Sequence, residues 1–292
     1  MKFICLVTCL ISFTVCSRLV QAENWRTITP DVIYGHKAGM ALTYDVIRPV
    51  DPNGAAVLFM VSGGWVSLWG DPEGVVRAEK AGGLNLFEKI VDQGYTLILV
   101  RHGSSPWFKV PDAVADVRLA IRHIRSQSDR FQIDPDRIGV CGGSAGGHLS
   151  LILGSLGDDG DVKGKAGLDR VSSRVQAVVA YFPPTDIREY VNHKTLSKDF
   201  PAIVFPNDQA DDVSPLLAVT SDDAPTLLIH GDQDELVPIS HSERYRDAMT
   251  KAGATCELIV MKGAAHGFPG DQGTQAETAL LEWFDRYLST KK

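Results

Sequence analysis

The strongest constraint on the fold is a series of short apolar segments that alternate with helical patterns. Residues 55–61 (AAVLFMV) and 95–100 (YTLILV) are continuous apolar runs, each preceded by glycine. Such runs are typical of strands buried on both faces of a parallel sheet. Similar segments follow at residues 137–141, 175–182, 226–230 and 256–261. Residues 41–48 (ALTYDVIR) alternate between apolar and polar side chains, which predicts an early antiparallel strand.

Helical patterns lie between these segments. In residues 112–126 and 277–288, apolar side chains recur every three or four positions, the spacing of a helix with one buried face. Pro111 stands where a helix tolerates proline, in its first turn. Strands that alternate with helices predict an α/β fold with a mostly parallel sheet and helices on both of its faces. Because no repeat or linker interrupts the pattern, we expect a single domain over residues 23–292.

The first 22 residues have the layout of a secretory signal peptide. Lys2 is followed by an apolar run over residues 3–16, and the small residue Ala22 marks a cleavage site. The run is short for a membrane span, so export to the periplasm or the exterior is preferred over an anchor. We expect no membrane span in the mature chain.

Charge and cysteine content exclude several classes of protein. The formal net charge is -7, and no basic run is long enough to follow a phosphate backbone, which argues against nucleic acid as a partner. Only Cys141 and Cys256 remain after the signal segment, so the mature chain is not a disulfide scaffold. Neither lies in a metal-binding spacing, and no metal or cofactor is predicted.

In residues 139–150 (GVCGGSAGGHLS), four glycines lie within three positions of Ser144: Gly142, Gly143, Gly146 and Gly147. A phosphate-binding loop needs Lys and then Ser or Thr after its last glycine, whereas His148 and Leu149 follow here. The G-x-S-x-G pattern at residues 142–146 follows a strand and precedes a helix, the context of a nucleophile elbow with an exposed serine hydroxyl. The alternative is an ordinary turn that contains an incidental serine.

A serine nucleophile needs a histidine base and a carboxylate that orients the base. In an elbow-type hydrolase the chain order is serine, acid, histidine, each at the end of a strand. Asp232 and Asp234 follow residues 226–230, and His266 follows residues 256–261. We therefore predict Ser144 and His266 with one of the two aspartates. His102, which also ends a strand, is the most credible competing base.

An oxyanion hole is predicted in the loop after residues 55–61. Gly63 and Gly64 allow backbone N–H groups to approach a substrate oxygen, and the N–H of Ala145 completes the site. The alternative is a simple Gly-Gly turn. No cofactor is needed for this chemistry.

With these motifs the chain resembles the α/β-hydrolase superfamily, and within it secreted esterases of the acetyl-esterase and BD-FAE-like group. The prolyl-oligopeptidase catalytic domain is a more distant resemblance. The most specific segments are residues 133–150, 214–238 (with HGDQDELVP) and 262–268 (KGAAHGF). The resemblance implies an α/β-hydrolase fold with a small insertion before the acid-bearing strand, and it makes Asp234 the acid, with Asp232 second.

The oxyanion loop departs from this resemblance. Many relatives carry His-Gly-Gly-Gly-Trp there, whereas residues 61–65 are Val-Ser-Gly-Gly-Trp. The two glycines nearest the substrate are kept, and the histidine that supports the loop is absent.

The expected function is hydrolysis of carboxylic esters through an acyl-enzyme at Ser144. Small to medium soluble esters fit, including acetyl or feruloyl esters of carbohydrates. The alternatives are a serine peptidase or amidase of the prolyl-oligopeptidase-like type and a non-catalytic binding protein on the same scaffold. Four aromatic residues follow strand ends and are predicted either to line a substrate pocket or to pack in the core: Trp65, Trp69, Trp107 and Phe268.

Overall fold

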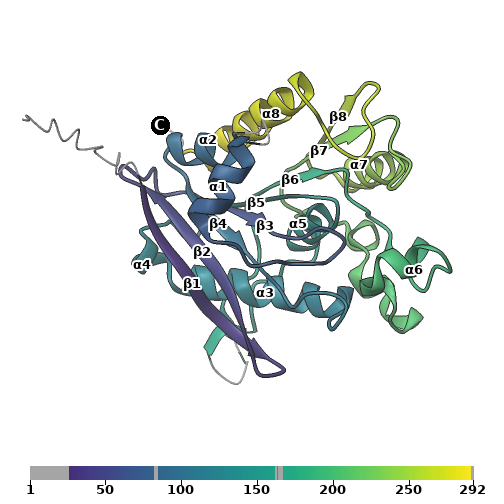
Figure 1. The fold of residues 1–292 in the computed structure, drawn as a ribbon, viewed down its shortest axis with the longest axis horizontal. Coiled ribbons are helices and arrows are strands. Elements are labelled where there is room, and N and C mark those ends of the chain that lie inside the picture. The colour runs from purple at the N-terminus through teal and green to yellow at the C-terminus, as the bar shows by residue number, and fades with distance from the viewer. Residues whose placement is uncertain (1–25, 82–84, 162, 164–166, 291–292) are drawn as a thin grey trace, which may run out of the picture.

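An eight-stranded sheet runs through the whole molecule (Figure 1). The computed structural model describes residues 26–290 apart from 82–84, 162 and 164–166, so the predicted signal segment lies outside the described residues. The strand order is β1-β2-β4-β3-β5-β6-β7-β8. The strands are β1 (Arg26–Lys37), β2 (Met40–Pro49), β3 (Ala56–Met60), β4 (Thr96–Val100), β5 (Ile138–Gly143), β6 (Ala177–Tyr181), β7 (Thr226–Gly231) and β8 (Cys256–Met261).

The sheet is mostly parallel, as predicted. Strand β2 pairs antiparallel with β1 and β4, and the pairs from β4 to β8 are all parallel. Every strand expected from the sequence forms, within two residues of the predicted bounds. Strand β1 was not predicted because its register shifts twice, once on each side of Val32 and Ile33, and a shifted register breaks the two-residue alternation of a regular strand.

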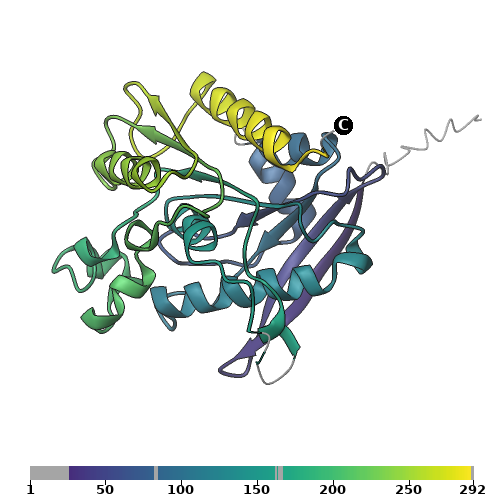
Figure 2. The same ribbon diagram turned by 180° about the vertical axis from the view of Figure 1, so that it is seen from behind.

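Helices cover both faces of the sheet, which confirms the prediction. Figures 1 and 2 show α1, α2 and α8 on one side and α3 on the other. Two separate groups of buried side chains fill the spaces between the sheet and these helices, and α5 and α7 belong to the group of α3. The helices are α1 (Pro72–Ala81), α2 (Leu86–Asp92), α3 (Val110–Ser126), α4 (Ser128–Phe131), α5 (Ala145–Ser155), α6 (Leu196–Asp199), α7 (Ser240–Ala252) and α8 (Asp271–Leu288).

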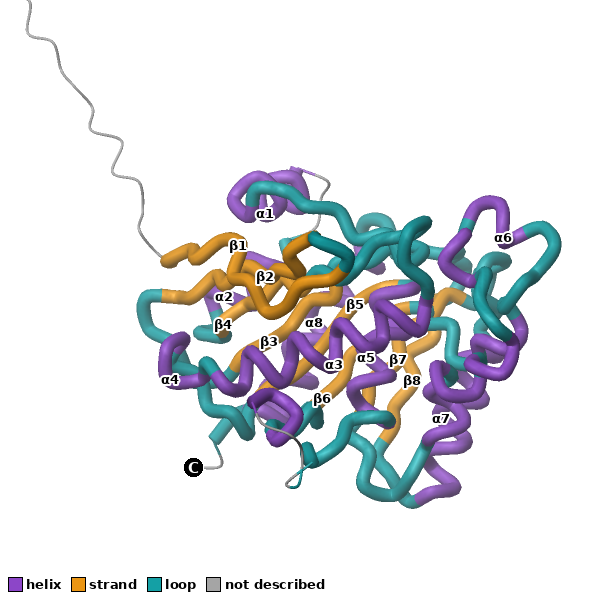
Figure 3. The backbone as a smooth tube through the Cα atoms, turned by 90° about the horizontal axis from the view of Figure 1, so that it is seen from below, coloured by secondary structure: helices purple, strands orange, loops and turns teal. Residues whose placement is uncertain are grey.

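The small insertion expected before the acid-bearing strand lies between β6 and β7. It consists of short 3-10 turns and the four-residue helix α6. Figure 3 shows it at the end of the sheet that β7 and β8 form, far from β1. None of the described helices is long and apolar enough to cross a membrane.

Parallel strands bring their following loops to one edge of the sheet. The loop after β3 carries Gly63 and Gly64, and Ser144 follows β5 directly. Asp234 follows β7, and His266 follows β8. Residues more than 200 positions apart in the chain therefore meet at this edge.

Candidate active site

Ser144 lies in a strained turn between β5 and α5. Its φ angle is 54°, in the left-handed region that residues other than glycine rarely adopt. A Cβ atom on Gly142 would lie 2.6 Å from the backbone of Gly146, and one on Gly146 would lie 2.7 Å from the Met60 carbonyl oxygen. Both positions therefore require glycine, which agrees with a nucleophile elbow. Strain of this kind is concentrated at functional sites.

Ser144, His266 and Asp234 form a continuous hydrogen-bonded chain. The Ser144 Oγ and His266 Nε2 atoms are 3.0 Å apart, and His266 Nδ1 is 2.7 Å from Asp234 Oδ2. Because a carboxylate oxygen only accepts, Nδ1 carries the proton and Nε2 is free to accept from the serine hydroxyl. This arrangement is the geometry of a nucleophile, a base and a group that orients the base.

Asp234 is held by its own turn. Its side chain is fully buried, and Oδ1 accepts hydrogen bonds from the N–H groups of Leu236 at 3.0 Å and Val237 at 2.9 Å. The buried His230 ring lies 3.3 Å from Oδ2 and also contacts the Val237 carbonyl. These contacts leave Oδ2 directed at His266.

Asp232, the second candidate for the acid, contacts other residues than His266. Its carboxylate accepts from the N–H of Gly263 at 2.7 Å and pairs with Lys262 at 3.2 Å. The Gly263 hydrogen bond lowers the pKa of this carboxyl. The structure thus brings Asp234, and not Asp232, to His266.

The competing base His102 and the thiol of Cys141 lie outside the hydrogen-bonded chain of Ser144, His266 and Asp234. His102 Nδ1 donates to the Gly103 carbonyl at 2.8 Å, and its Nε2 accepts from the Ser62 hydroxyl at 2.8 Å. Cys141 is fully buried in β5, and burial raises the pKa of its thiol. Among the described residues no three His, Cys, Asp or Glu side chains gather into a possible metal site.

The oxyanion loop folds as a tight hairpin turn. Gly63 and Val66 exchange two backbone hydrogen bonds, of 3.1 Å and 2.9 Å, across Gly64 and Trp65. Both central residues have positive φ angles, of 56° and 57°, as in a type I′ turn. The N–H of Gly63 therefore already donates to Val66 and is not the free donor that the sequence suggested. Gly64 stays beside Ser144 as a wall of the same cavity.

Two buried neutral histidines support this loop. His148 Nε2 donates to the Val213 carbonyl at 2.7 Å, so its Nδ1 accepts from the Trp65 indole N–H at 3.2 Å. His102 holds Ser62 in the same way. Burial lowers the pKa of His102 and lowers that of His148 to about 4, which keeps both rings neutral and able to accept. Both supporting histidines come from other elements of the chain, so a local motif does not reveal them.

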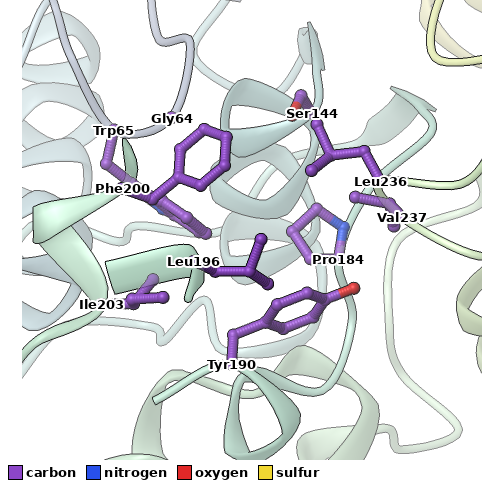
Figure 4. A pocket seen from close by; sticks show the side chains of 10 residues that line it. All are labelled: Gly64, Trp65, Ser144, Pro184, Tyr190, Leu196, Phe200, Ile203, Leu236 and Val237. Carbon is purple, nitrogen blue, oxygen red and sulfur yellow. The ribbon is translucent and has the colours of Figure 1, made fainter. Parts of the chain in front are cut away.

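A narrow cavity opens beside Ser144 (Figure 4). It has a volume of about 30 Å³, and Figure 4 shows Trp65 and Phe200 facing Leu236 and Val237 across it. The remaining walls come from Gly64, Pro184, Tyr190, Leu196 and Ile203. Half of the lining therefore comes from the segment between β6 and β7, whose apolar residues sequence reasoning did not single out.

Only one of the four predicted aromatic residues lines this cavity. Trp65 does so, whereas Trp107 is 85% exposed and does not. Trp69 is 63% exposed and lines a different cavity. Phe268 lines a third one, where it packs against Phe182, whose ring lies 4.5 Å from the His266 ring. The four aromatic residues therefore do not form one common pocket: three line different cavities, and Trp107 is exposed.

Comparison with known proteins shows the family of this chain. The chain matches the BD-FAE family model over residues 47–249. It is 27% identical over 251 residues to the esterase LipQ of Mycobacterium tuberculosis, covering 82% of this chain and 57% of LipQ. It is 25% identical over 284 residues to an acetylxylan esterase of Xylanibacter ruminicola, covering 93% of this chain and 52% of the relative. The chain spans about half the length of the curated relatives it matches.

Solved structures are similar over most of the chain. A truncated form of a carbohydrate esterase from gut microbiota has a TM-score of 0.74 at 26% identity, covering 92% of this chain and 99% of that chain. Thermogutta terrifontis esterase 2 phosphonylated by sarin has a TM-score of 0.73 at 25% identity, covering 89% of this chain and 96% of that chain. The chain has the α/β-hydrolase fold and belongs to the BD-FAE family.

Proposed function

We propose that this protein is a serine carboxylesterase that acts through an acyl-enzyme at Ser144. The observation that carries the proposal is the hydrogen-bonded chain from the Ser144 hydroxyl through His266 to the buried Asp234. The esterase names of the relatives, among them an acetylxylan esterase and a carbohydrate esterase, support it.

The geometry assigns each residue a step. His266 Nε2 takes the proton of Ser144 as Oγ attacks the ester carbonyl, and Asp234 stabilises the imidazolium that forms. In this mechanism the N–H groups of Gly64, which lines the Ser144 cavity, and of Ala145 donate to the negative oxygen of the tetrahedral intermediate. His266 then gives its proton to the leaving alcohol. A water molecule, activated by the same nitrogen, releases the acid and restores Ser144.

An activity panel tests the proposal against its alternatives. We expect the purified protein to hydrolyse p-nitrophenyl acetate and to leave an aminoacyl p-nitroanilide intact, because an alcohol leaves the tetrahedral intermediate more readily than an amine. Faster turnover of the anilide would favour the peptidase alternative. Failure of a fluorophosphonate probe to label Ser144 would favour a non-catalytic binding protein.

The narrow cavity predicts a preference for short acyl groups such as acetyl. A Cβ atom on Gly64 would lie 2.7 Å from Phe200 Cδ1, so the phenyl ring closes the space directly against the oxyanion loop. Phe200→Ala is expected to raise kcat/KM for p-nitrophenyl butyrate relative to the acetate by about tenfold, since each buried methylene contributes about 0.8 kcal/mol.

Leu217→Ala is the matched control for this substitution. Leu217 belongs to the same insertion but is 44% exposed and does not line the Ser144 cavity. For Leu217→Ala, the ratio of kcat/KM for p-nitrophenyl butyrate to kcat/KM for the acetate should equal that of the wild type. A Phe200→Ala ratio equal to that of the control would show that Phe200 does not limit acyl length.

A further inference from the structure

Phe182, the residue that follows β6, has an unusual backbone conformation. Its φ angle is 38°, in the left-handed region that glycine favours and bulky residues rarely adopt. The Phe182 N–H donates to the Ile229 carbonyl at 2.9 Å, and the carbonyl of the preceding Tyr181 accepts from the Ser144 N–H at 2.9 Å. Strain that neighbouring bonds maintain is concentrated at functional sites. The conformation therefore points to a role for the Phe182 side chain.

The Phe182 ring contacts both His266 and the serine turn. The centroids of the Phe182 and His266 rings are 4.5 Å apart, at an interplanar angle of 53°. A Cβ atom on Gly143 would lie 3.2 Å from Phe182 Cε2, so the ring also packs directly against the residue before Ser144. Phe268 meets the ring edge-to-face, with the centroids 5.2 Å apart. These contacts hold the Phe182 ring beside the base.

The two hydrogen bonds of His266 do not by themselves fix the tilt of its ring. Nδ1 bonds Asp234 Oδ2 at 2.7 Å, and Nε2 bonds Ser144 Oγ at 3.0 Å. These bonds hold the two nitrogen atoms, but the imidazole can still rotate about the line that joins them. A neighbouring ring at 4.5 Å limits this rotation. Phe182 therefore keeps Nε2 aligned with the serine hydroxyl.

The same ring stabilises a positive charge on His266. When His266 takes the Ser144 proton it becomes an imidazolium, and a cation within about 6 Å of an aromatic centroid is attracted by the electrons of the ring. The Phe182 ring lies within this distance. Because His266 becomes charged only as the reaction proceeds, this attraction is stronger in the transition state than in the resting enzyme.

We propose that Phe182 is a positioning residue for His266: its ring holds the imidazole in line with Ser144 and stabilises the imidazolium that forms. The inference rests on the proposed esterase function and concerns the same site. It accounts for a bulky side chain at a backbone conformation that favours glycine, because a glycine at position 182 would leave the base without this contact.

Phe182→Leu tests the proposal, because leucine keeps an apolar side chain but has no aromatic ring. For p-nitrophenyl acetate we expect kcat to fall about tenfold, the range of one cation–π contact, with KM unchanged. The acidic limb of the kcat/KM profile should move to lower pH by about half a unit to one unit, since a less stabilised imidazolium releases its proton more readily. A loss of kcat without this shift would show a purely structural role and overturn the proposal.

Phe87→Leu is the matched control, because other titratable groups lie near this contact. The His230 ring lies 3.3 Å from the acid of the site, and burial lowers the pKa of His230, which keeps it neutral. Glu79 and Glu277 line the cavity that the Phe182 ring also lines, and burial raises the pKa of Glu79 to about 7. Phe87 lines this cavity too, and its N–H donates to Glu79. Equal pH shifts in both variants would assign the shift to Glu79 and overturn the proposal.

Phe182→Gly separates the ring from the backbone strain. Glycine relieves the left-handed conformation and removes the ring, so we expect the same losses as in Phe182→Leu. A kcat equal to that of the wild type in this variant would show that the ring is not needed.

An NMR titration of His266 makes the outcome independent of activity, with His266→Gln used to identify its signal. The midpoint in Phe182→Leu should lie below that of the wild type. If this difference is present but the wild type hydrolyses no ester, the esterase proposal fails and the role of Phe182 stands. Equal midpoints overturn that role whatever the activity.

Discussion

Replacement of Ser144 by alanine is expected to reduce kcat for p-nitrophenyl acetate by about 10⁶-fold, the loss typical of a missing serine nucleophile. The Ser144 hydroxyl forms the acyl-enzyme. The other hydroxyl of the cavity lining, that of Tyr190, lies 2.9 Å from His241 Nε2, and burial raises its pKa, so it does not take the place of Ser144. Alanine fits the same turn because glycines at positions 142 and 146 provide the space. The fold should therefore remain intact, as circular dichroism can check.

Ser150→Ala provides a matched control for this loss. Ser150 lies on α5, the helix that directly follows Ser144. Its hydroxyl donates to the Gly146 carbonyl at 2.8 Å and is not paired with His266. We expect kcat close to that of the wild type. Hydrolysis by Ser144→Ala at the rate of this control would remove Ser144 from the mechanism. Mass spectrometry should locate a fluorophosphonate adduct on Ser144 in the wild type and in Ser150→Ala.

Asp234→Asn is expected to lower kcat by about 10⁴-fold while the fold is preserved. The backbone N–H groups of Leu236 and Val237 both donate to Oδ1, so an asparagine must keep its oxygen at that position. Its amide nitrogen then replaces Oδ2 and faces His266 Nδ1. Two donors cannot share that contact, so the imidazole is driven to the tautomer with its proton on Nε2. In that form it cannot accept the Ser144 proton.

Asp232→Asn is the control, and it also decides between the two aspartates. Asp232 contacts Gly263 and Lys262 at the surface, so its replacement should change kcat by a few-fold at most. Steady-state kinetics of both variants at neutral pH provide the comparison. A large loss in Asp232→Asn together with a small loss in Asp234→Asn would reverse the assignment of the acid.

Much of the fold was readable from local patterns. Continuous apolar runs mark β3 to β8 because strands of a parallel sheet are buried on both faces, and one-sided patterns mark α3 and α8. Helix α8 begins at Asp271, six residues before the predicted start, since its first turns have no regular apolar spacing. Strand β1 was not predicted, because bulges interrupt the alternation of its side chains. Local periodicity reports burial, and it fails where the backbone departs from regular geometry.

The candidate site also has features that the sequence predicts and features that only the folded structure shows. The order of Ser144, Asp234 and His266 at strand ends was visible in the sequence, because parallel strands bring their following loops to one edge. Only the tertiary structure puts Phe200 against Gly64. It also placed His102 and His148 under the oxyanion loop. The physical reason is that residue chemistry and spacing are local properties, whereas the partner of each donor and the walls of each cavity depend on how distant segments pack.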